Sequence, residues 1–405
     1  MTPHALISSD FHDVIKPLIN LTKIFGFLPV CSSQKGQKTC LNLSINYCIC
    51  GYIFSAILFS LSILGLTEDL NSAPIRMKNP IVKYIILIDL GEVAVTVLAG
   101  ILTTPFKLPY FWKMLTGFGK IEQVLPPHHA PEEKKRSFWA VTIFLVLAAS
   151  VIFFDVVVWG LSASDLGVFF KRFLPVYVSY LLIFVQQIPF CFFVRVIRLK
   201  IEDLNGAFRA GLERVQNGEN QWISVMKVNK QPKVIQGKSA LSYERLNEFM
   251  RLVEEIEDVI EAINGFYGVH TLLILFSCLL HLVVTPYYLL IEVCNAGYLP
   301  FILLQVAWIV LHLIRLMVIV ETCQRCIDEY QVTTNLVLKL LTSPLLPDIK
   351  EQVEILAVQV SNKKIKFSSF GMLKISRSLL TSFGGALTTF LVILFQYGGI
   401  HGNVY

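Results

Sequence analysis

The chain has 405 residues, of which 54% are hydrophobic and 16% charged, and its formal net charge is +6 at pH 7. Soluble domains average about 25% charged residues, and a soluble chain this apolar could not cover its surface with polar groups. The composition therefore excludes a soluble enzyme and a disordered chain, and it predicts an integral membrane protein.

Seven segments are apolar over the ~20 residues that a helix needs to cross a bilayer. They are residues 47–66, 81–103, 137–161, 173–197, 266–291, 298–320 and 378–398. The polar and mixed segment before the first span is expected to be a cytosolic tail with no cleavable signal peptide. The predicted fold is thus an all-α membrane protein with seven transmembrane helices.

Lysines and arginines are distributed unevenly among the segments between these spans. The amino-terminal tail and the loops 104–136, 198–265 and 321–377 hold 28 of the 35, whereas the opposite loops hold four. Because positive charge concentrates in cytosolic loops, the count predicts a cytosolic amino terminus and an extracellular carboxy terminus. The asymmetry explains the net charge without a nucleic-acid partner.

The long loops contain helical patterns of their own. Between 241 and 263, apolar residues recur every three or four positions and charged residues fill the other face, which predicts an amphipathic helix running into the fifth span. Residues 321–341 and 350–360 show the same pattern, whereas the pattern of residues 215–240 indicates a linker. We expect these helices to extend the bundle into a cytosolic anchor, partnered by the same chain or by a second copy.

Several polar side chains fall within the spans, where they are costly and hence functional candidates. The predicted topology directs them to one outward-facing region. Carboxylates and amides bind hydroxyl groups and an indole ring covers the C–H face of a sugar, so the set favours a small polyol. Anchoring at the membrane interface and bonds between helices are the simpler explanations, and they are preferred for His312 and Arg315. The ligand-binding candidates are Asp89, Glu92, Asp155, Tyr177, His281, Thr285, Gln305 and Trp308, with Tyr180, Tyr287 and Tyr288 nearby.

The last span differs from the others in composition. It begins with small and polar residues, continues through an apolar run and carries Gln396 near its outer end. Small residues allow close helix packing. Hydroxyl groups, a glutamine and a ring of apolar side chains also suit a water-filled path that closes by dewetting. The residues alone leave packing and pore lining open.

This last span resembles the signature of the insect gustatory receptor family, a Thr-Tyr pair followed by five apolar residues and Gln-Phe. The chain reads Thr389, Phe390, five apolar residues, Gln396 and Tyr397. The aromatic rings are kept, but the hydroxyl group has moved. The chain is most similar to the fructose receptor branch in residues 74–78 with Asp89, and in residues 276–283, 308–315 and 380–383.

The resemblance implies a ligand-gated, non-selective cation channel of four copies in the plasma membrane of sensory neurons. It implies a ligand pocket within each subunit, to which Gln305 and Trp308 contribute. It also implies a central pore lined by the last helix, with Thr389, Phe390, Phe395 and Gln396 as pore or gate candidates. The expected divisions are a tail (1–46), a ligand-binding bundle with loop 198–265 (47–320), anchor helices (321–377) and the pore helix with a short extracellular tail (378–405).

The main hypothesis is a channel that is gated by a sugar and built from four copies of this chain or together with related receptors. Other classes of protein are alternatives to it. A G-protein-coupled chemoreceptor would place its amino terminus outside. A sugar transporter is usually built on repeats, and no matching halves are visible. An enzyme is least favoured, because no HExxH, GxSxG or phosphate-loop motif occurs. No cofactor or metal is predicted, because Cys323 and Cys326 form a lone CxxC pair. Within the channel class, inositol or a bitter compound could replace the sugar.

Overall fold

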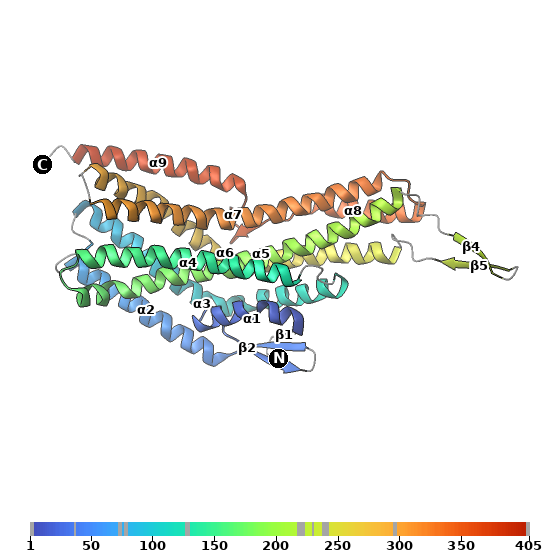
Figure 1. The fold of residues 1–405 in the computed structure, drawn as a ribbon, viewed down its shortest axis with the longest axis horizontal. Helices are drawn as coiled ribbons and strands as arrows, with labels where there is room; N and C mark the ends of the chain where they lie inside the picture. Colours follow the sequence, from blue (N-terminus) through green and yellow to red (C-terminus); the bar gives the residue numbers. More distant parts are fainter. Residues whose placement is uncertain are drawn as a thin grey trace.

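Long helices that run side by side dominate the structure (Figure 1). It is a computed structural model that describes residues 4–35, 38–71, 75–76, 80–125, 130–216, 223–228, 231–236, 243–294 and 298–401. Six of its helices are long and apolar enough to cross a membrane. They are α2 (Ile45–Asn71), α3 (Pro80–Val124), α4 (Ala130–Ser162), α5 (Leu166–Gln216), α6 (Tyr243–Cys294) and α7 (Leu299–Leu341).

These six helices coincide with the first six predicted spans. The seventh predicted span lies on α9 (Arg377–His401), whose described apolar stretch, Arg377–Ile393, is shorter than the other six. The count of seven spans and the orientation of the termini stay predictions. What the structure establishes is a helical bundle with at least six helices of membrane-spanning character.

Several helices are much longer than a membrane is thick. With 51 and 52 residues, α5 and α6 extend for about 75 Å at 1.5 Å per residue, against a hydrocarbon core of about 30 Å. The excess forms one end of the bundle, on the right in Figure 1, where α8 (Pro347–Asn362) packs against α6 and α7. The predicted amphipathic helix is therefore confirmed as a continuous extension of α6, with Val253 and Ile256 buried on its apolar face.

The amino-terminal segment has more structure than the predicted tail. Strands β1 (His4–Ser8), β2 (Val30–Lys35) and β3 (Lys38–Leu43) form an antiparallel sheet in the order β1-β3-β2, with helix α1 (Ser9–Ile24) beside it. Phe11 and Ile15, one helical turn apart, are buried, and the Phe11 ring lies 5.4 Å from that of Phe118 on α3. The apolar stripe of α1 is too short to span a membrane but long enough to dock on the bundle.

Two further hairpins qualify the all-α prediction. Strands β4 (Ile223–Val228) and β5 (Gln231–Gln236) pair within the predicted linker, and β6 (Ser368–Ser369) pairs with β7 (Leu373–Lys374) just before α9. The turn of the second hairpin holds Phe370 and Gly371 at positive φ. Asn264 on α6 fixes this hairpin, because its amide donates to the Lys366 carbonyl and accepts from the Ser368 N–H.

Helix α9 lies along the outside of the bundle, where it contacts α6 and α7 (Figure 1). Among its described side chains, only that of Leu379 is buried. Phe390, Val392 and Ile393 are exposed, although they belong to the apolar run of this helix. A single chain therefore leaves much of α9 without packing partners of its own.

Candidate ligand-binding site

Five of the predicted ligand-binding residues come together from five different helices. Asp89 lies on α3, Asp155 on α4, Tyr177 on α5, His281 on α6 and Trp308 on α7. All five lie toward the end of the bundle at which α4 ends and α7 begins, on the left in Figure 1. The antiparallel course of the helices brings these distant residues to one level.

The centre of this cluster is Arg76, in the segment between α2 and α3. Its guanidinium group donates to the Asp155 carboxylate and to the Tyr177 hydroxyl, which itself donates to Asp155. The rings of Trp159 and Phe173 lie 5.0 and 4.9 Å from the guanidinium carbon. Because both charged side chains are more than nine-tenths buried, their hydrogen bonds and the cation–π contacts compensate for lost hydration.

Trp308 ties α7 to the same carboxylate. Its indole N–H donates to Oδ2 of Asp155 at 2.7 Å. Its ring lies 5.0 Å from that of Tyr180, which extends the aromatic wall to the next turn of α5. Asp155 therefore accepts hydrogen bonds from three elements, and the aromatic rings around it present both apolar faces and polar edges.

His281 forms the opposite side of the cluster. Its Nδ1 lies 2.8 Å from the Ser277 carbonyl oxygen, so it carries the proton, and Nε2 accepts from the Tyr180 hydroxyl at 3.1 Å. Oδ1 of Asp89 lies 3.5 Å from the same Nε2, longer than a good hydrogen bond. Asp89 is thus near the histidine without a tight bond through this oxygen.

Two polar atoms of the cluster remain available for a ligand. Nε of Arg76 and Oδ1 of Asp89 are buried and have no hydrogen-bond partner among the described residues. Buried polar atoms are rarely left in this state unless water, an ion or a ligand satisfies them. One is a donor and the other an acceptor, and a hydroxyl group can bond to either kind of atom.

Of the other three candidates, Glu92 lies beside this network, and its Oε2 is likewise buried without a hydrogen-bond partner among the described residues. Glu92 accepts a hydrogen bond from Thr96, one turn further along α3, at 2.5 Å. Thr285 is buried on α6 and Gln305 is half-buried on α7. Conversely, the sequence placed Arg76 in a loop and in a segment of the family resemblance, but not among the ligand-binding candidates. The aromatic residues Trp159 and Phe173, which surround it, were the available signal.

A second layer connects the cluster to deeper parts of α5 and α7. The His312 ring stacks on Trp308 at 5.4 Å and lies 4.2 Å from the His281 ring. Arg315 contacts His312 at 3.3 Å, and its carbonyl accepts from Gln187 on α5 at 3.1 Å. The sequence predicted bonds between helices for His312 and Arg315, and the Arg315 contact joins α7 to α5 in this way.

The pore candidates lie apart from this cluster, on α9. Thr389, Phe390 and Gln396 are exposed, and the Thr389 hydroxyl donates to the Gly385 carbonyl at 2.9 Å. The side chain of Phe395 lies outside the described residues, as do Pro74, Met77 and Lys78 of the segment that carries part of the family resemblance.

Known proteins share both the sequence pattern and the fold. The sugar taste gustatory receptor 43a of Drosophila melanogaster is 22% identical over 417 residues, covering 94% of this chain and 97% of the relative. The putative gustatory receptor 28b of the same fly is 35% identical over 88 residues, which cover 22% of this chain and 19% of that receptor. The solved olfactory receptor OR5 of Machilis hrabei superposes with a TM-score of 0.65 at 12% identity, covering 96% of this chain and 98% of that one.

The long apolar helices and the buried polar cluster define a multi-pass membrane receptor. Residues 15–398 match the 7tm chemosensory receptor family, and the chain belongs to that family. The resemblance to insect gustatory receptors, and to their sugar-sensing branch, is confirmed. A structure of OR5 in complex with eugenol also superposes, with a TM-score of 0.60 at 12% identity over 96% of this chain and 99% of that one.

Proposed function

We propose that the protein is a taste receptor that acts as a sugar-gated, non-selective cation channel of four identical chains. The proposed ligand is fructose or a closely related sugar, and the proposed location is the plasma membrane of sensory neurons. The similarity to a sugar taste receptor over almost the whole chain supports the ligand class. The observation that carries the proposal is the buried cluster of Arg76, Asp155 and Trp308.

The chemistry of the cluster suits a polyol. A sugar hydroxyl can accept a hydrogen bond from Nε of Arg76 and donate one to Oδ1 of Asp89. Neither atom has a hydrogen-bond partner among the described residues. The rings of Trp308 and Tyr180 provide apolar faces for the C–H side of the same sugar. In the proposed mechanism the sugar binds the open state better and shifts the equilibrium toward it.

The exposure of α9 supports the proposed pore. A single chain leaves Phe390, Val392 and Ile393 uncovered, and four chains around an axis would bury part of this apolar surface. Thr389 and Gln396 would then contribute polar groups to the pore, and apolar side chains would close it by dewetting. The extensions of α6, α7 and α8 would form the cytosolic anchor.

Current recording from cells that express this chain alone tests the proposal directly. The panel should contain fructose, glucose, inositol and several bitter compounds, with surface labelling to confirm expression. Cation currents evoked by a sugar would support the proposal. Currents evoked only by inositol or a bitter compound would support the proposed channel activity but would show that its ligand is not a sugar.

The assembly and the orientation need separate tests. Photobleaching of fluorescently tagged chains should show four steps. An amino-terminal epitope tag should stain only after the cells are permeabilised. Staining of intact cells, together with a response that requires a G protein, would instead indicate a G-protein-coupled receptor.

A further inference from the structure

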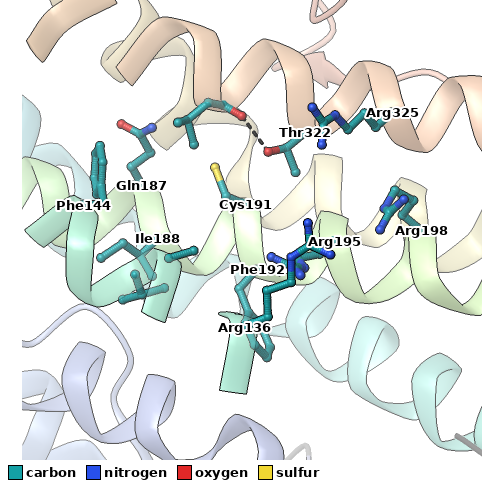
Figure 2. A pocket seen from close by; sticks show the side chains of 13 residues that line it. Arg136, Phe144, Gln187, Ile188, Cys191, Phe192, Arg195, Arg198, Thr322 and Arg325 are labelled. Atoms are coloured by element: carbon teal, nitrogen blue, oxygen red, sulfur yellow. Dashed lines mark hydrogen bonds between the residues drawn. The ribbon is translucent and has the colours of Figure 1, made fainter. Parts of the chain in front are cut away.

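A cavity of about 250 Å³ lies between α4, α5 and α7, away from the ligand-binding cluster (Figure 2). Four arginines line it, and none of its described lining residues is acidic. They are Arg136 on α4, Arg195 and Arg198 on α5 and Arg325 on α7. Gln187, which bonds to Arg315 in the second layer of the cluster, lines the same cavity.

The cavity has a cationic end and an apolar end. Figure 2 shows the four guanidinium groups toward one side and Phe144, Gln187 and Ile188 toward the other. The order of residues along α4 and α5 agrees, because Phe144 contacts Phe184 at 5.8 Å, about three helical turns from Arg195. Such a gradient matches a phospholipid, whose acyl chains are apolar and whose headgroup is charged.

The cationic end also lies where a headgroup would be. Arg136 just precedes the apolar stretch Phe138–Ser162 of α4, and Arg325 follows the predicted sixth span by five residues. In the proposed orientation this level is the cytosolic membrane surface, where anionic lipids concentrate. The side chains of Arg325 and Arg198 are 64% and 25% exposed, so a headgroup can reach both.

Two of these arginines have acidic neighbours that do not line the cavity. Glu202 lies 3.6 Å from Arg198, and Glu321 accepts from Arg325 at 2.9 Å. Guanidinium groups bind phosphate with paired, charge-assisted hydrogen bonds. A basic pocket between membrane helices on the cytosolic side is the arrangement that binds anionic headgroups.

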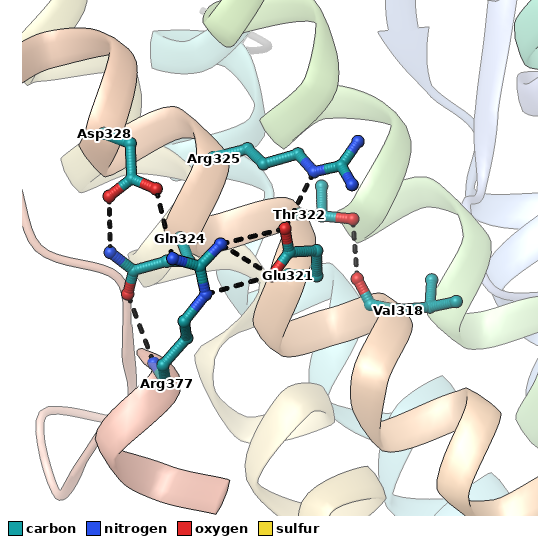
Figure 3. A network of polar contacts seen from close by, with 7 residues as sticks. All are labelled: Val318, Glu321, Thr322, Gln324, Arg325, Asp328 and Arg377. Atoms are coloured by element: carbon teal, nitrogen blue, oxygen red, sulfur yellow. Dashed lines mark hydrogen bonds and ion pairs between the residues drawn. The ribbon is translucent and has the colours of Figure 1, made fainter. Parts of the chain in front are cut away.

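Glu321 links this cavity to α9. Oε1 of Glu321 accepts from Arg325 at 2.9 Å and also from Arg377, the first residue of α9, at 3.0 Å (Figure 3). Two arginines therefore share one carboxylate oxygen. A phosphate group that drew Arg325 into the cavity would leave this oxygen to Arg377 and would strengthen the bond between α7 and α9.

We propose that this cavity binds an anionic phospholipid of the cytosolic leaflet, with the phosphate at the four arginines and the acyl chains beside Phe144. The bound lipid strengthens the contact of Glu321 with Arg377 and so increases sensitivity to sugar. The second statement rests on the proposed channel function and orientation, whereas lipid binding by itself does not need a current.

Binding is tested by native mass spectrometry of the full-length protein with phosphatidylinositol bisphosphate, phosphatidylserine or phosphatidylcholine. The variant R195Q/R198Q should bind the anionic lipids at least about tenfold more weakly, because it loses two charge-assisted phosphate contacts. The matched control R209Q/R214Q changes two exposed arginines further along α5 and should bind normally. R195K/R198K should restore part of the binding and shows whether the site tolerates substitution.

Two further experiments test whether the bound phosphate belongs to a lipid or to a soluble compound. A140F places a ring in the cavity without changing charge, and it should weaken lipid binding because it occupies the space of the acyl chains. Inositol trisphosphate and inorganic phosphate should compete poorly, because they have no acyl chains. Competition by either at the concentration of the lipid would overturn the lipid assignment, as would equal binding of phosphatidylcholine or equal losses in both double variants.

The effect on α9 is tested in excised patches with the cytosolic face exposed. Short-chain phosphatidylinositol bisphosphate should lower the sugar concentration for half-maximal current severalfold in the wild type but not in R325Q. A sugar response that the lipid leaves unchanged would overturn the link to α9 while leaving the binding result in place. A protein that binds the lipid but never responds to sugar would count against the proposed function alone.

Discussion

Trp308 on α7 donates its indole N–H to Oδ2 of Asp155 on α4 across 2.7 Å. This bond joins two helices whose residues are 153 positions apart, and both groups are buried. The same carboxylate accepts from Arg76, so any ligand that competes for Asp155 affects both contacts. The proposed pocket can therefore be tested one hydrogen bond at a time.

Replacing Trp308 with Phe removes the N–H donor and keeps an aromatic ring. Without this bond neither Asp155 nor the ring at position 308 is held in place for the sugar, so we expect the sugar concentration for half-maximal current to rise about tenfold or more. Whole-cell dose–response curves measure this shift, with surface labelling to correct for expression. W139F, which changes an exposed tryptophan on α4, is the matched control. An unchanged curve for W308F would remove Trp308 from the pocket.

The pair formed by Arg76 and Asp155 should behave as a unit. R76Q leaves a buried carboxylate without its cation, which we expect to cost about 3–5 kcal/mol of folding stability. The double variant R76Q/D155N removes both charges and should recover part of that loss. Melting temperatures of the purified protein in detergent, measured for the two single variants and the double variant, give the coupling. Strictly additive losses would show that the two side chains do not interact.

Asp89 and Glu92 lie three residues apart on α3 but have different neighbours, so variants of the two test which carboxylate contributes to sugar binding. D89N removes the charge of a carboxylate that has a free acceptor atom beside His281, and we expect about a tenfold loss of sugar sensitivity. Oε2 of Glu92 is also buried without a hydrogen-bond partner among the described residues, but Oε1 already accepts from Thr96 and E92Q keeps such an acceptor, so we expect a smaller shift, of about twofold. Dose–response curves measured side by side decide the matter. Equal shifts would place Glu92 in the pocket as well.

The convergence of Asp155 and Trp308 was predictable because the depth of a residue in a membrane helix follows from its position in the span. Antiparallel helices then bring residues of equal depth to one level. The position of Arg76 was not predictable in this way, because it lies in a loop. The packing of Trp159 and Phe173 determines where its guanidinium group lies, and a linear sequence does not show that packing.

The amino-terminal segment shows the same limit for the fold. A run of twenty apolar residues is a strong signal, and the first six predicted spans all lie on long helices. Phe11 and Ile15 form only a short stripe, and the antiparallel pairing of β1 with β3 joins residues thirty or more positions apart. Contacts of that kind depend on the tertiary structure, so a polar and mixed composition gave the appearance of a plain tail.

The contact between Arg377 and Glu321 should transmit movement from α7 to α9. Arg377 donates to both carboxylate oxygens, at 3.0 and 3.1 Å, and its N–H donates to Gln324 at 3.2 Å. These groups are exposed to solvent, which screens the ion pair, so its contribution is small. We expect R377Q to raise the half-maximal sugar concentration up to about fivefold, because α9 follows α7 less closely. R251Q, which changes an exposed arginine on α6, should have no effect.

The pH dependence of this contact has a definite sign. Hydrogen bonds from Arg377 and Arg325 lower the pKa of Glu321 below its ordinary value. A carboxylate with a lowered pKa keeps its contact above the ordinary pKa and loses it only as the pH falls through the lowered one. Acidifying the cytosolic face from about pH 7.4 to about pH 5.5 should therefore leave the difference between wild type and R377Q unchanged. Dose–response curves from excised patches at both values measure it, and loss of the difference at the lower pH would show that the pKa of Glu321 is not lowered by Arg377 and Arg325.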